Sequence, residues 1–169
     1  MKIVVSIIIP FYSNINLLKK TVKSVLNQTF NKYEIIIIHD NPKSLTNNFK
    51  NIFKIKKNLK IIYNKKNIGA GLSRNKGIHM SKGKYVAFVD SDDIWNNNKL
   101  IKQINFMERY KYLATHTSYD RVDINGKLIS TRVAKNLDYK RLLNSCDIGL
   151  SSVILNKRIL KKKIEFPPL

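Results

Sequence analysis

The sequence has little cysteine and no long hydrophobic run. Cys146 is the only cysteine among 169 residues, which excludes an internal disulfide, and without a surrounding Cys/His cluster it does not make a zinc site. The chain therefore suits a reducing cytoplasm. The apolar run Ile3 to Phe11 is about half the length of a membrane-spanning helix, and Pro10 lies inside it. No small-residue cleavage site follows, so we interpret this run as a buried strand, ended by Pro10, and not as a signal peptide.

Acidic residues are also scarce. The chain has 32 Lys+Arg against 11 Asp+Glu, a formal net charge of +21. Such a charge suits a nucleic-acid or anionic-membrane partner, but the basic residues are dispersed along the chain, which favours compositional drift over a selected anionic partner. Because no RNA-binding or helix-turn-helix signature is present, we expect no nucleic-acid partner. Contact with anionic lipid headgroups stays open.

The hydrophobic pattern alternates between strands and helices. Apolar, β-branched runs predict buried strands at residues 2–9, 33–38, 59–63 and 85–89, and helical spacing predicts helices at 14–28, 49–53 and 70–81. This order predicts an α/β fold with a Rossmann-like, mostly parallel sheet and helices on both faces. A further helix at 96–109 and a hairpin turning at Asn125-Gly126 form an α+β extension. No linker interrupts the chain, so we expect one domain over 1–169.

Asp90, Asp92 and Asp93 directly follow the last of these buried strands. Ligands of open α/β sheets bind beyond the carboxyl ends of the strands. Like charges so close together are unfavourable unless a cation compensates them, and Mg²⁺ and Mn²⁺ prefer carboxylate oxygens while sharing their coordination with substrate phosphates. The cluster therefore predicts a metal-bridged diphosphate. A solvated turn, or a cap in which Asp92 or Asp93 begins the following helix, is the alternative.

Three other polar positions follow strands or begin a helix. Tyr12 suits stacking on a nucleobase or covering the sheet edge. Asp40 suits hydrogen bonding to a base or ribose, or an Asx turn into Pro42. Arg74 suits bidentate phosphate binding, or a solvated charge. Ligand spacing is absent among the histidines, for which we expect structural roles: His39, His79 and His116.

Several segments together resemble family 2 glycosyltransferases of the GT-A fold, in the order and at the spacing of that family. They are SIIIPFYS (6–13), SVLNQTF (24–30), EIIII (34–38), NIG (67–69) with SRNKG (73–77), and GKYVAFVDSDD (83–93). The resemblance extends from residue 3 to about residue 168. It implies that about 1–95 binds a nucleotide-sugar and that about 96–169 is an incomplete acceptor-side part.

The resemblance implies an inverting transfer from a UDP- or dTDP-linked sugar to a glycan or lipid-linked acceptor, in cell-surface polysaccharide or lipid-linked glycan synthesis. With a charge of +21, a cytoplasmic position at the inner face of the cell membrane stays open. It also implies a divalent metal, Mn²⁺ or Mg²⁺. By position, the nucleoside pocket would be lined by Pro10, Phe11 and Tyr12, and Asp40 would contact the base. Arg74 would lie near the uracil or the diphosphate. Asp90 would approach the ribose, and Ser91 beside it would also contact the nucleotide-sugar. Asp92 would be the metal ligand.

The chain departs from the family pattern in two places. The usual Asp-Asp-Gly-Ser after the second strand is His39-Asp40-Asn41-Pro42. The acidic pair that carries the acceptor-side base in the family is not found before Leu169, so the resemblance implies a catalytic base beyond that residue. A catalytically inactive binding remnant and a basic nucleic-acid-binding module are the alternative functions.

Overall fold

The computed structural model describes residues 2–44, 53, 58–136, 138, 140, 144–145, 147–160 and 165–167. The expected helix at 49–53 lies outside these ranges except for Phe53, and Cys146 lies outside them as well. A six-stranded sheet forms the centre of the molecule, with the strand order β3-β2-β1-β4-β8-β5. Its strands are β1 (Val5–Phe11), β2 (Tyr33–His39), β3 (Leu59–Tyr63), β4 (Tyr85–Phe88), β5 (Ala114–Thr115) and β8 (Ile154–Asn156).

The first four strands along the chain are parallel, as the hydrophobic pattern predicts. β8 pairs antiparallel with β4 on one side and with β5 on the other, which the sequence pattern does not predict. A strand of three residues is too short to show a period. Through β8, the second half of the chain adds to the sheet that the first half begins.

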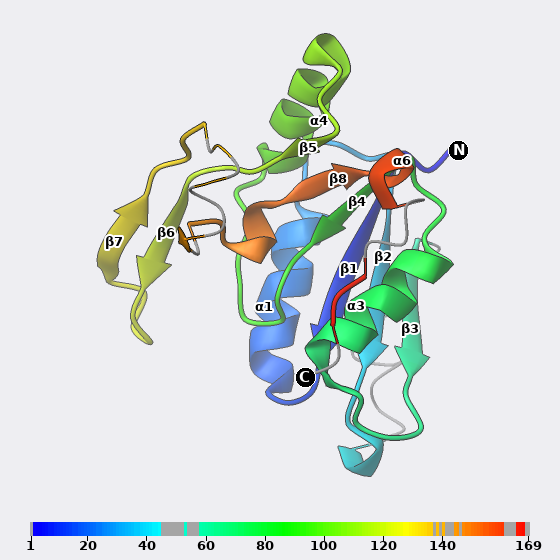
Figure 1. The fold of residues 1–169 in the computed structure, drawn as a ribbon. Coiled ribbons are helices and arrows are strands. Elements are labelled where there is room, and N and C mark those ends of the chain that lie inside the picture. Colours follow the sequence, from blue (N-terminus) through cyan, green and yellow to red (C-terminus); the bar gives the residue numbers. More distant parts are fainter. Residues whose placement is uncertain are drawn as a thin grey trace.

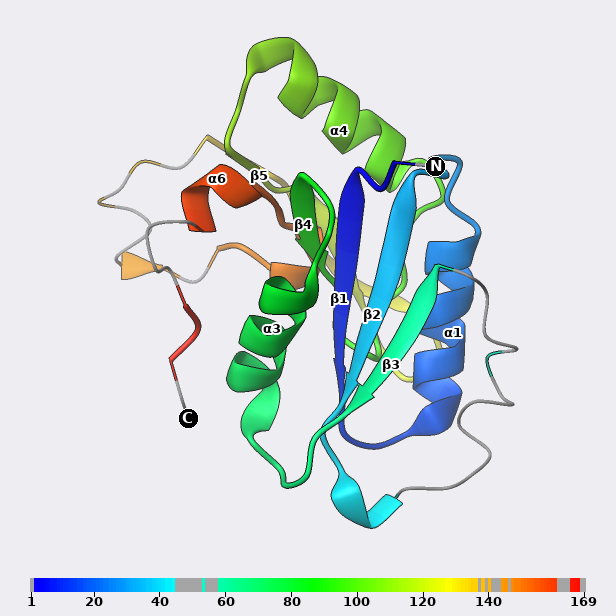
Figure 2. The same ribbon diagram turned by 90° about the vertical axis from the view of Figure 1, so that its right-hand side faces the viewer.

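Helices cover both faces of the sheet, which confirms the predicted α/β architecture (Figures 1 and 2). The helix α1 (Ile15–Leu26) lies on one face, and α3 (Gly69–Met80) lies on the other. The helix α4 (Lys99–Tyr110) lies at the end of the molecule where the parallel strands begin. Asn14 caps α1 by accepting a hydrogen bond from the Leu17 amide at 3.2 Å.

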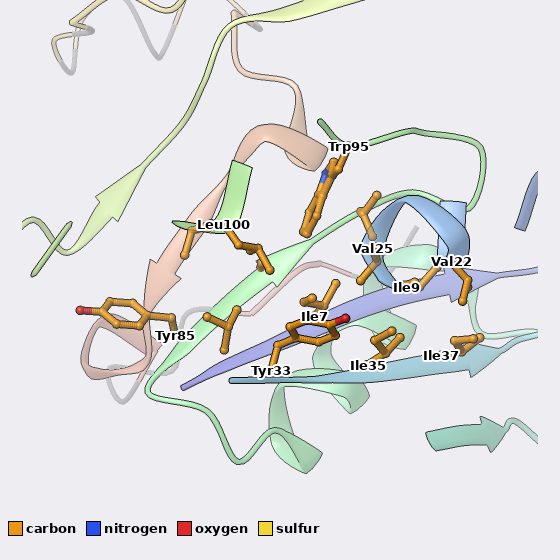
Figure 3. Packing of buried hydrophobic residues seen from close by; sticks show 14 of the residues in the cluster. Ile7, Ile9, Val22, Val25, Tyr33, Ile35, Ile37, Tyr85, Trp95 and Leu100 are labelled. Atoms are coloured by element: carbon orange, nitrogen blue, oxygen red, sulfur yellow. The ribbon is translucent and has the colours of Figure 1, made fainter. Parts of the chain in front are cut away.

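The main core lies between the sheet and the helix α1 (Figure 3). Ile7, Ile9 and Ile35 point from the strands toward Val22 and Val25 of α1, and all are almost completely buried. Burying aliphatic side chains of this size stabilises a fold by about 1.5–3 kcal/mol each. The alternate residue Ile8 faces α3 instead. A Cβ at Gly77 of α3 would lie 2.5 Å from Ile8 Cγ2, so only glycine allows this approach.

The strand β1 runs through Pro10 to Phe11, so the expectation that Pro10 ends it is wrong. The hydrogen bonds explain why proline fits. The Phe11 carbonyl accepts from the Asp40 amide on the β2 side, whereas the Ile8 carbonyl accepts from the Val89 amide on the β4 side. Pro10 has the same orientation as Ile8, and β4 pairs with β1 only as far as Ile8. Its missing N–H therefore lies beyond the paired part of β4.

A buried carboxylate joins the amino ends of the central strands. Glu34, on β2, is 1% exposed and accepts from Ser6 Oγ at 2.7 Å, from the Lys82 amide at 2.7 Å and from Lys60 Nζ at 3.0 Å. Burial by itself would raise the pKa of Glu34, but these hydrogen bonds and the Lys60 charge outweigh it and lower that pKa. The network lies away from the carboxyl edge of the sheet, so its role is structural.

The remaining elements are short. They are the 3-10 helices η1 (Pro42–Ser44) and η2 (Leu150–Ser152), the helix α6 (Lys157–Leu160), and the separate two-stranded sheet of β6 (Tyr119–Val122) and β7 (Leu128–Arg132). The hairpin predicted around Asn125-Gly126 is confirmed, with Gly126 at a φ of 83°. Among the residues that the structure describes, no helix is long and apolar enough to cross a membrane.

Candidate functional site

Asp90 to Asp93 form a tight turn between β4 and α4. The Asp93 amide donates to the Asp90 carbonyl at 3.1 Å, which closes the turn. Asp92 and Asp93 are exposed, and Asp90 and Ser91 are partly exposed. The helix α4 begins later, at Lys99, with Asn98 as its cap and no side-chain cap hydrogen bond. These carboxylates therefore do not cap α4, and that alternative for the acidic cluster is wrong.

Arg74 of α3 forms an ion pair with Asp90 in this turn. Its Nη2 lies 2.6 Å from Asp90 Oδ1, and the Arg74 side chain is only 14% exposed. A solvated charge is thus the wrong interpretation of Arg74. Its Nε is buried and has no hydrogen-bond partner among the described residues. The pair connects the helix on one face of the sheet to the acidic turn, which the sequence places sixteen residues further along the chain.

The segment around Phe166 holds Arg74 from the other side. The Phe166 amide donates to Asn75 Oδ1 at 2.9 Å, and Asn75 Nδ2 donates to the Phe166 carbonyl at 2.8 Å. The Arg74 guanidinium lies 5.5 Å from the centre of the Phe166 ring, a cation–π distance. A Cβ on Gly71 would lie 2.8 Å from the Pro167 carbonyl oxygen. The sequence gives no sign of this contact, because no period or motif links the two segments.

Ser151 of η2, in the second half of the chain, fixes the acidic turn. Its Oγ accepts from the Asp90 amide at 3.0 Å, and its carbonyl accepts from Trp95 Nε1 at 2.8 Å. Although Asp93 is an exposed residue, the protein around its carboxyl group partly desolvates it and raises its pKa. A hydrogen bond with Ser151 lowers that pKa, and the charges of Asp90 and Asp92 raise it. Arg74 pairs with Asp90, so Asp92 and Asp93 carry the remaining negative charge of the turn. Sequence reasoning missed Ser151, since serine is common in turns.

A second basic residue near the acidic turn is Lys99, the first residue of α4. Its Nζ donates to Gln103 Oε1 and, at 3.2 Å, to the Ser152 carbonyl, and it lies 4.7 Å from the centre of the Trp95 ring. Burial lowers the pKa of Lys99 to about 7. Neutral acceptors and an aromatic ring thus surround this amine, so Lys99 does not neutralise the turn as Arg74 does.

Asp40 lies at the carboxyl end of β2 and is only 3% exposed. It accepts hydrogen bonds from the Ile68 amide at 3.0 Å, the Gly69 amide at 2.8 Å and Asn64 Nδ2 at 2.7 Å. Asp40 therefore accepts hydrogen bonds from backbone amides at the start of α3, whose N-cap residue, Ile68, makes no side-chain cap hydrogen bond. The Asx turn expected here belongs to Asn41, whose Oδ1 accepts from the Lys43 amide at 3.1 Å. Contact of Asp40 with a base stays a prediction.

The residues expected to line a nucleoside pocket differ in exposure. Pro10 and Phe11 are buried, whereas Tyr12 is 52% exposed at the end of β1. His39 is fully buried, and its ring lies 5.3 Å from the ring of Phe11 and 5.3 Å from that of Tyr63. Burial lowers the pKa of His39. The structural role expected for His39 fits this packing, and of the three pocket residues Tyr12 is the one that a ligand can reach without rearrangement.

These side chains share one edge of the sheet. Asp40, Tyr12 and Asp90 follow β2, β1 and β4, which are neighbours in the sheet and parallel. Among the described residues, no group of three or more His, Cys, Asp or Glu side chains forms a complete metal site. Asp92 and Asp93 nevertheless fit a hard divalent ion, because such ions are commonly held by one or two carboxylates together with water and substrate phosphates. The edge thus offers carboxylates for a metal and an exposed ring, and Arg74 holds the first carboxylate of the turn in place.

Comparisons with known proteins agree with this geometry. The chain is 39% identical over 155 residues to an uncharacterized glycosyltransferase of Rickettsia bellii, a match that covers 89% of this chain and 22% of the relative. It is 37% identical to the Escherichia coli UDP-Glc:alpha-D-GlcNAc-diphosphoundecaprenol beta-1,3-glucosyltransferase WfaP, over 96% of this chain and 64% of that protein. The crystal structure of Staphylococcus aureus TarS 1-349 in complex with UDP superposes with a TM-score of 0.76 at 25% identity, over 99% of this chain and 50% of TarS.

The match to TarS identifies the sheet and its helices as the GT-A fold. The chain spans less than two thirds of the length of each of these proteins. The model of the family described as "Glycosyl transferase family 2" matches residues 6–165, which include the acidic turn, Arg74 and Ser151. The chain therefore belongs to glycosyl transferase family 2.

Proposed function

We propose that this chain binds a nucleoside-diphosphate-sugar at the carboxyl edge of the sheet and contributes the donor half of an inverting glycosyltransferase. The observation that carries the proposal is the pairing of Arg74 with Asp90 at 2.6 Å, next to the exposed carboxylates of Asp92 and Asp93. A guanidinium beside a carboxylate pair can hold a diphosphate and its counterion together. Tyr12 would cover the base, and Pro10 and Phe11 would support it from within β1.

In this proposal Asp92 is the direct ligand of Mn²⁺ or Mg²⁺, and Asp90 and Ser91 lie toward the ribose. When bound, the metal would supply Lewis-acid stabilisation of the negative charge on the departing diphosphate. Arg74 would keep Asp90 oriented, and Ser151 would keep the turn closed around it. The acceptor hydroxyl attacks the anomeric carbon on the side opposite the diphosphate, so the configuration inverts. The proton of the acceptor hydroxyl goes to a catalytic base, which we do not assign to any of the described residues.

For the acceptor, we propose a glycan carried on a lipid diphosphate, in the synthesis of a cell-surface polysaccharide. The support is the relative WfaP, whose name specifies a diphosphoundecaprenol-linked acceptor and a UDP-glucose donor. TarS was crystallised with UDP, which supports a uridine nucleotide over a thymidine one. An acceptor of this kind would bring the protein to the cytoplasmic face of the membrane, where a net charge of +21 would favour anionic lipid.

Calorimetry tests the proposal. The expected result is binding of UDP or dTDP that requires Mn²⁺ or Mg²⁺, that is lost in Asp92→Ala and that is retained in Asp120→Ala, a matched change in the hairpin. No heat with any nucleoside diphosphate would contradict the proposal. Metal-independent binding of DNA or RNA, with an affinity that falls steeply with salt, would favour a basic nucleic-acid-binding module instead.

A further inference from the structure

The β6–β7 hairpin exposes an unusual amount of apolar surface. It forms a sheet of its own beside the six-stranded sheet (Figure 1). Its large aliphatic side chains are all more than half exposed: Val122 54%, Ile124 99%, Leu128 57% and Ile129 60%. Val133, which follows β7, is 66% exposed. Single exposed aliphatic residues are ordinary, whereas a contiguous group of them marks a surface that contacts something else. Val122, Ile124 and Leu128 lie in or directly beside the turn, and we call these three residues the apolar tip.

The turn that carries the apolar tip is closed by its own hydrogen bonds. Asp123 Oδ1 accepts from the Asn125 amide at 2.9 Å and from the Lys127 amide at 2.8 Å. The Asp123 amide donates to the Lys127 carbonyl at 2.9 Å, and Gly126 adopts the left-handed φ of 83° that the turn requires. Ile124 is therefore held outward by a defined turn.

Positive charge accompanies the apolar tip. The exposed basic side chains of the hairpin are Arg121, Lys127 and Arg132, and the exposed Lys135 follows β7. The two acidic residues are engaged within the hairpin, since Asp120 accepts from Thr131 Oγ1 at 2.6 Å and Asp123 accepts from the turn amides. A surface that combines exposed aliphatic groups with unneutralised Lys and Arg complements an anionic bilayer, which takes up the apolar groups and attracts the cations.

The orientation of the hairpin agrees with this partner. In Figure 1 its turn points toward the same end of the molecule as the carboxyl ends of β1, β2 and β3. A second exposed group lies at the end of α4, where the rings of Phe106 and Tyr110 contact each other and the ring of Tyr112, two residues beyond the helix, contacts Phe106. That helix lies at the amino ends of the strands, with Glu108 bound to the Tyr85 hydroxyl at 2.8 Å. A bilayer there would face away from the acidic turn.

We propose that the β6–β7 hairpin is the membrane-contacting element of this protein, and that it inserts the apolar tip into an anionic bilayer while its basic residues bind the lipid headgroups. The orientation argument rests on the proposed function, because a lipid-linked acceptor requires the carboxyl edge of the sheet to face the membrane. The exposure and charge of the hairpin do not depend on that function.

Tryptophan substitution tests which surface enters the bilayer. The native Trp95 is 6% exposed, so it provides a constant background. With phosphatidylglycerol vesicles that contain brominated acyl chains, the fluorescence of Ile124→Trp is expected to be quenched and shifted to shorter wavelength. The matched control Tyr110→Trp, on α4, is expected to show neither change. Quenching of Tyr110→Trp but not of Ile124→Trp would overturn the proposal.

Vesicle flotation measures the contribution of the tip. The double variant Ile124→Ser/Leu128→Ser is expected to bind anionic vesicles at least about tenfold more weakly than the parent, because two aliphatic groups no longer leave water. The control Tyr110→Ser/Tyr112→Ser is expected to bind as the parent does. Equal flotation of the parent on phosphatidylcholine and phosphatidylglycerol, or unchanged flotation of Ile124→Ser/Leu128→Ser, would overturn the proposal.

Two further measurements separate the alternatives. Sedimentation velocity without lipid is expected to give the same oligomeric state for the parent and for Ile124→Ser/Leu128→Ser. A parent that self-associates, with a double variant that does not, would instead make the hairpin an interface between copies of the chain. Calorimetry with UDP and Mn²⁺ is expected to give the parent affinity for Ile124→Ser/Leu128→Ser. If the parent itself does not bind UDP, the proposed donor site fails while the flotation result still decides the role of the hairpin.

Discussion

The Arg74 guanidinium and the Asp90 carboxylate meet across 2.6 Å at the carboxyl edge of the sheet, and Phe166 lies against the same guanidinium. Asp90 is 39% exposed and remains open to solvent, whereas the Arg74 side chain is mostly covered. The pair therefore presents one carboxylate in a fixed orientation at the start of the acidic turn. In our proposal this orientation prepares the turn for the nucleotide.

Removing the guanidinium should weaken nucleotide binding. Arg74→Ala is expected to lower the affinity for UDP with Mn²⁺ by about tenfold or more, since a hydrogen bond to a charged group contributes about 1.5–3 kcal/mol. Arg74→Lys should recover only part of this loss, because lysine lacks the planar fork. The measurement is calorimetry, with Arg109→Ala on α4 as the control. Equal losses in Arg74→Ala and Arg109→Ala would show that net charge alone matters.

Ser151 should tune the ionisation of Asp93. Its hydrogen bond lowers the pKa of Asp93 against the raising effects of burial and of the neighbouring carboxylates, so Ser151→Ala should raise that pKa further. Titration of the Asp93 carboxyl carbon by NMR measures the change. Ser152→Ala serves as the control, because the Ser152 hydroxyl donates to the Gly149 carbonyl at 2.6 Å. An unchanged Asp93 titration in Ser151→Ala would contradict the assigned contact.

Asp40 should stabilise the fold whether or not it contacts a base. Asp40→Ala leaves the Ile68 and Gly69 amides without their carboxylate acceptor, and we expect a loss of about 1–3 kcal/mol in the free energy of unfolding. Urea denaturation measures it. Asp92→Ala, which removes an exposed carboxylate, should leave the unfolding free energy nearly unchanged. Equal stability of the two variants would contradict the capping role of Asp40.

Glu34 should give the protein a pH-dependent stability. Its folded-state pKa is lowered, so the stability that it contributes is present above the ordinary glutamate pKa and is lost as the pH falls through the folded-state pKa. Glu34→Gln should therefore be less stable than the parent at neutral pH and should lose less of its stability on acidification. Urea midpoints between neutral and acidic pH measure this, with the exposed Glu165→Gln as the control. Parallel pH profiles of parent and Glu34→Gln would refute it.

Much of the architecture could be predicted from the sequence because the strands are buried on both faces. Continuous β-branched runs such as Ile35 to Ile38 leave few alternatives to a parallel sheet with helices on both sides. Pro10 misled the prediction of where β1 ends, since a local rule about proline does not reveal that β4 pairs no further than Ile8. β8 was missed because its three residues join the sheet through long-range pairing only.

Only part of the candidate site could be predicted, because local patterns reveal charged residues but not long-range contacts. Asp90 to Asp93 and Arg74 carry charge at recognisable positions, so their types and spacing are informative. The contacts that hold them come from Ser151, Asn75 and Phe166, which are far away in the sequence and common in any fold. Asp40 was identified as important, but whether its carboxylate contacts backbone amides or a ligand depends on the placement of the start of α3.

The position of the metal and the diphosphate is the central claim, and anomalous diffraction from crystals soaked with Mn²⁺ and UDP tests it most directly. The account predicts a manganese peak at coordination distance from an Asp92 carboxylate oxygen, bridged to the diphosphate of a UDP whose base lies against Tyr12. UDP bound away from the carboxyl edge of the sheet, or a manganese peak that Asp92 does not contact, would contradict it.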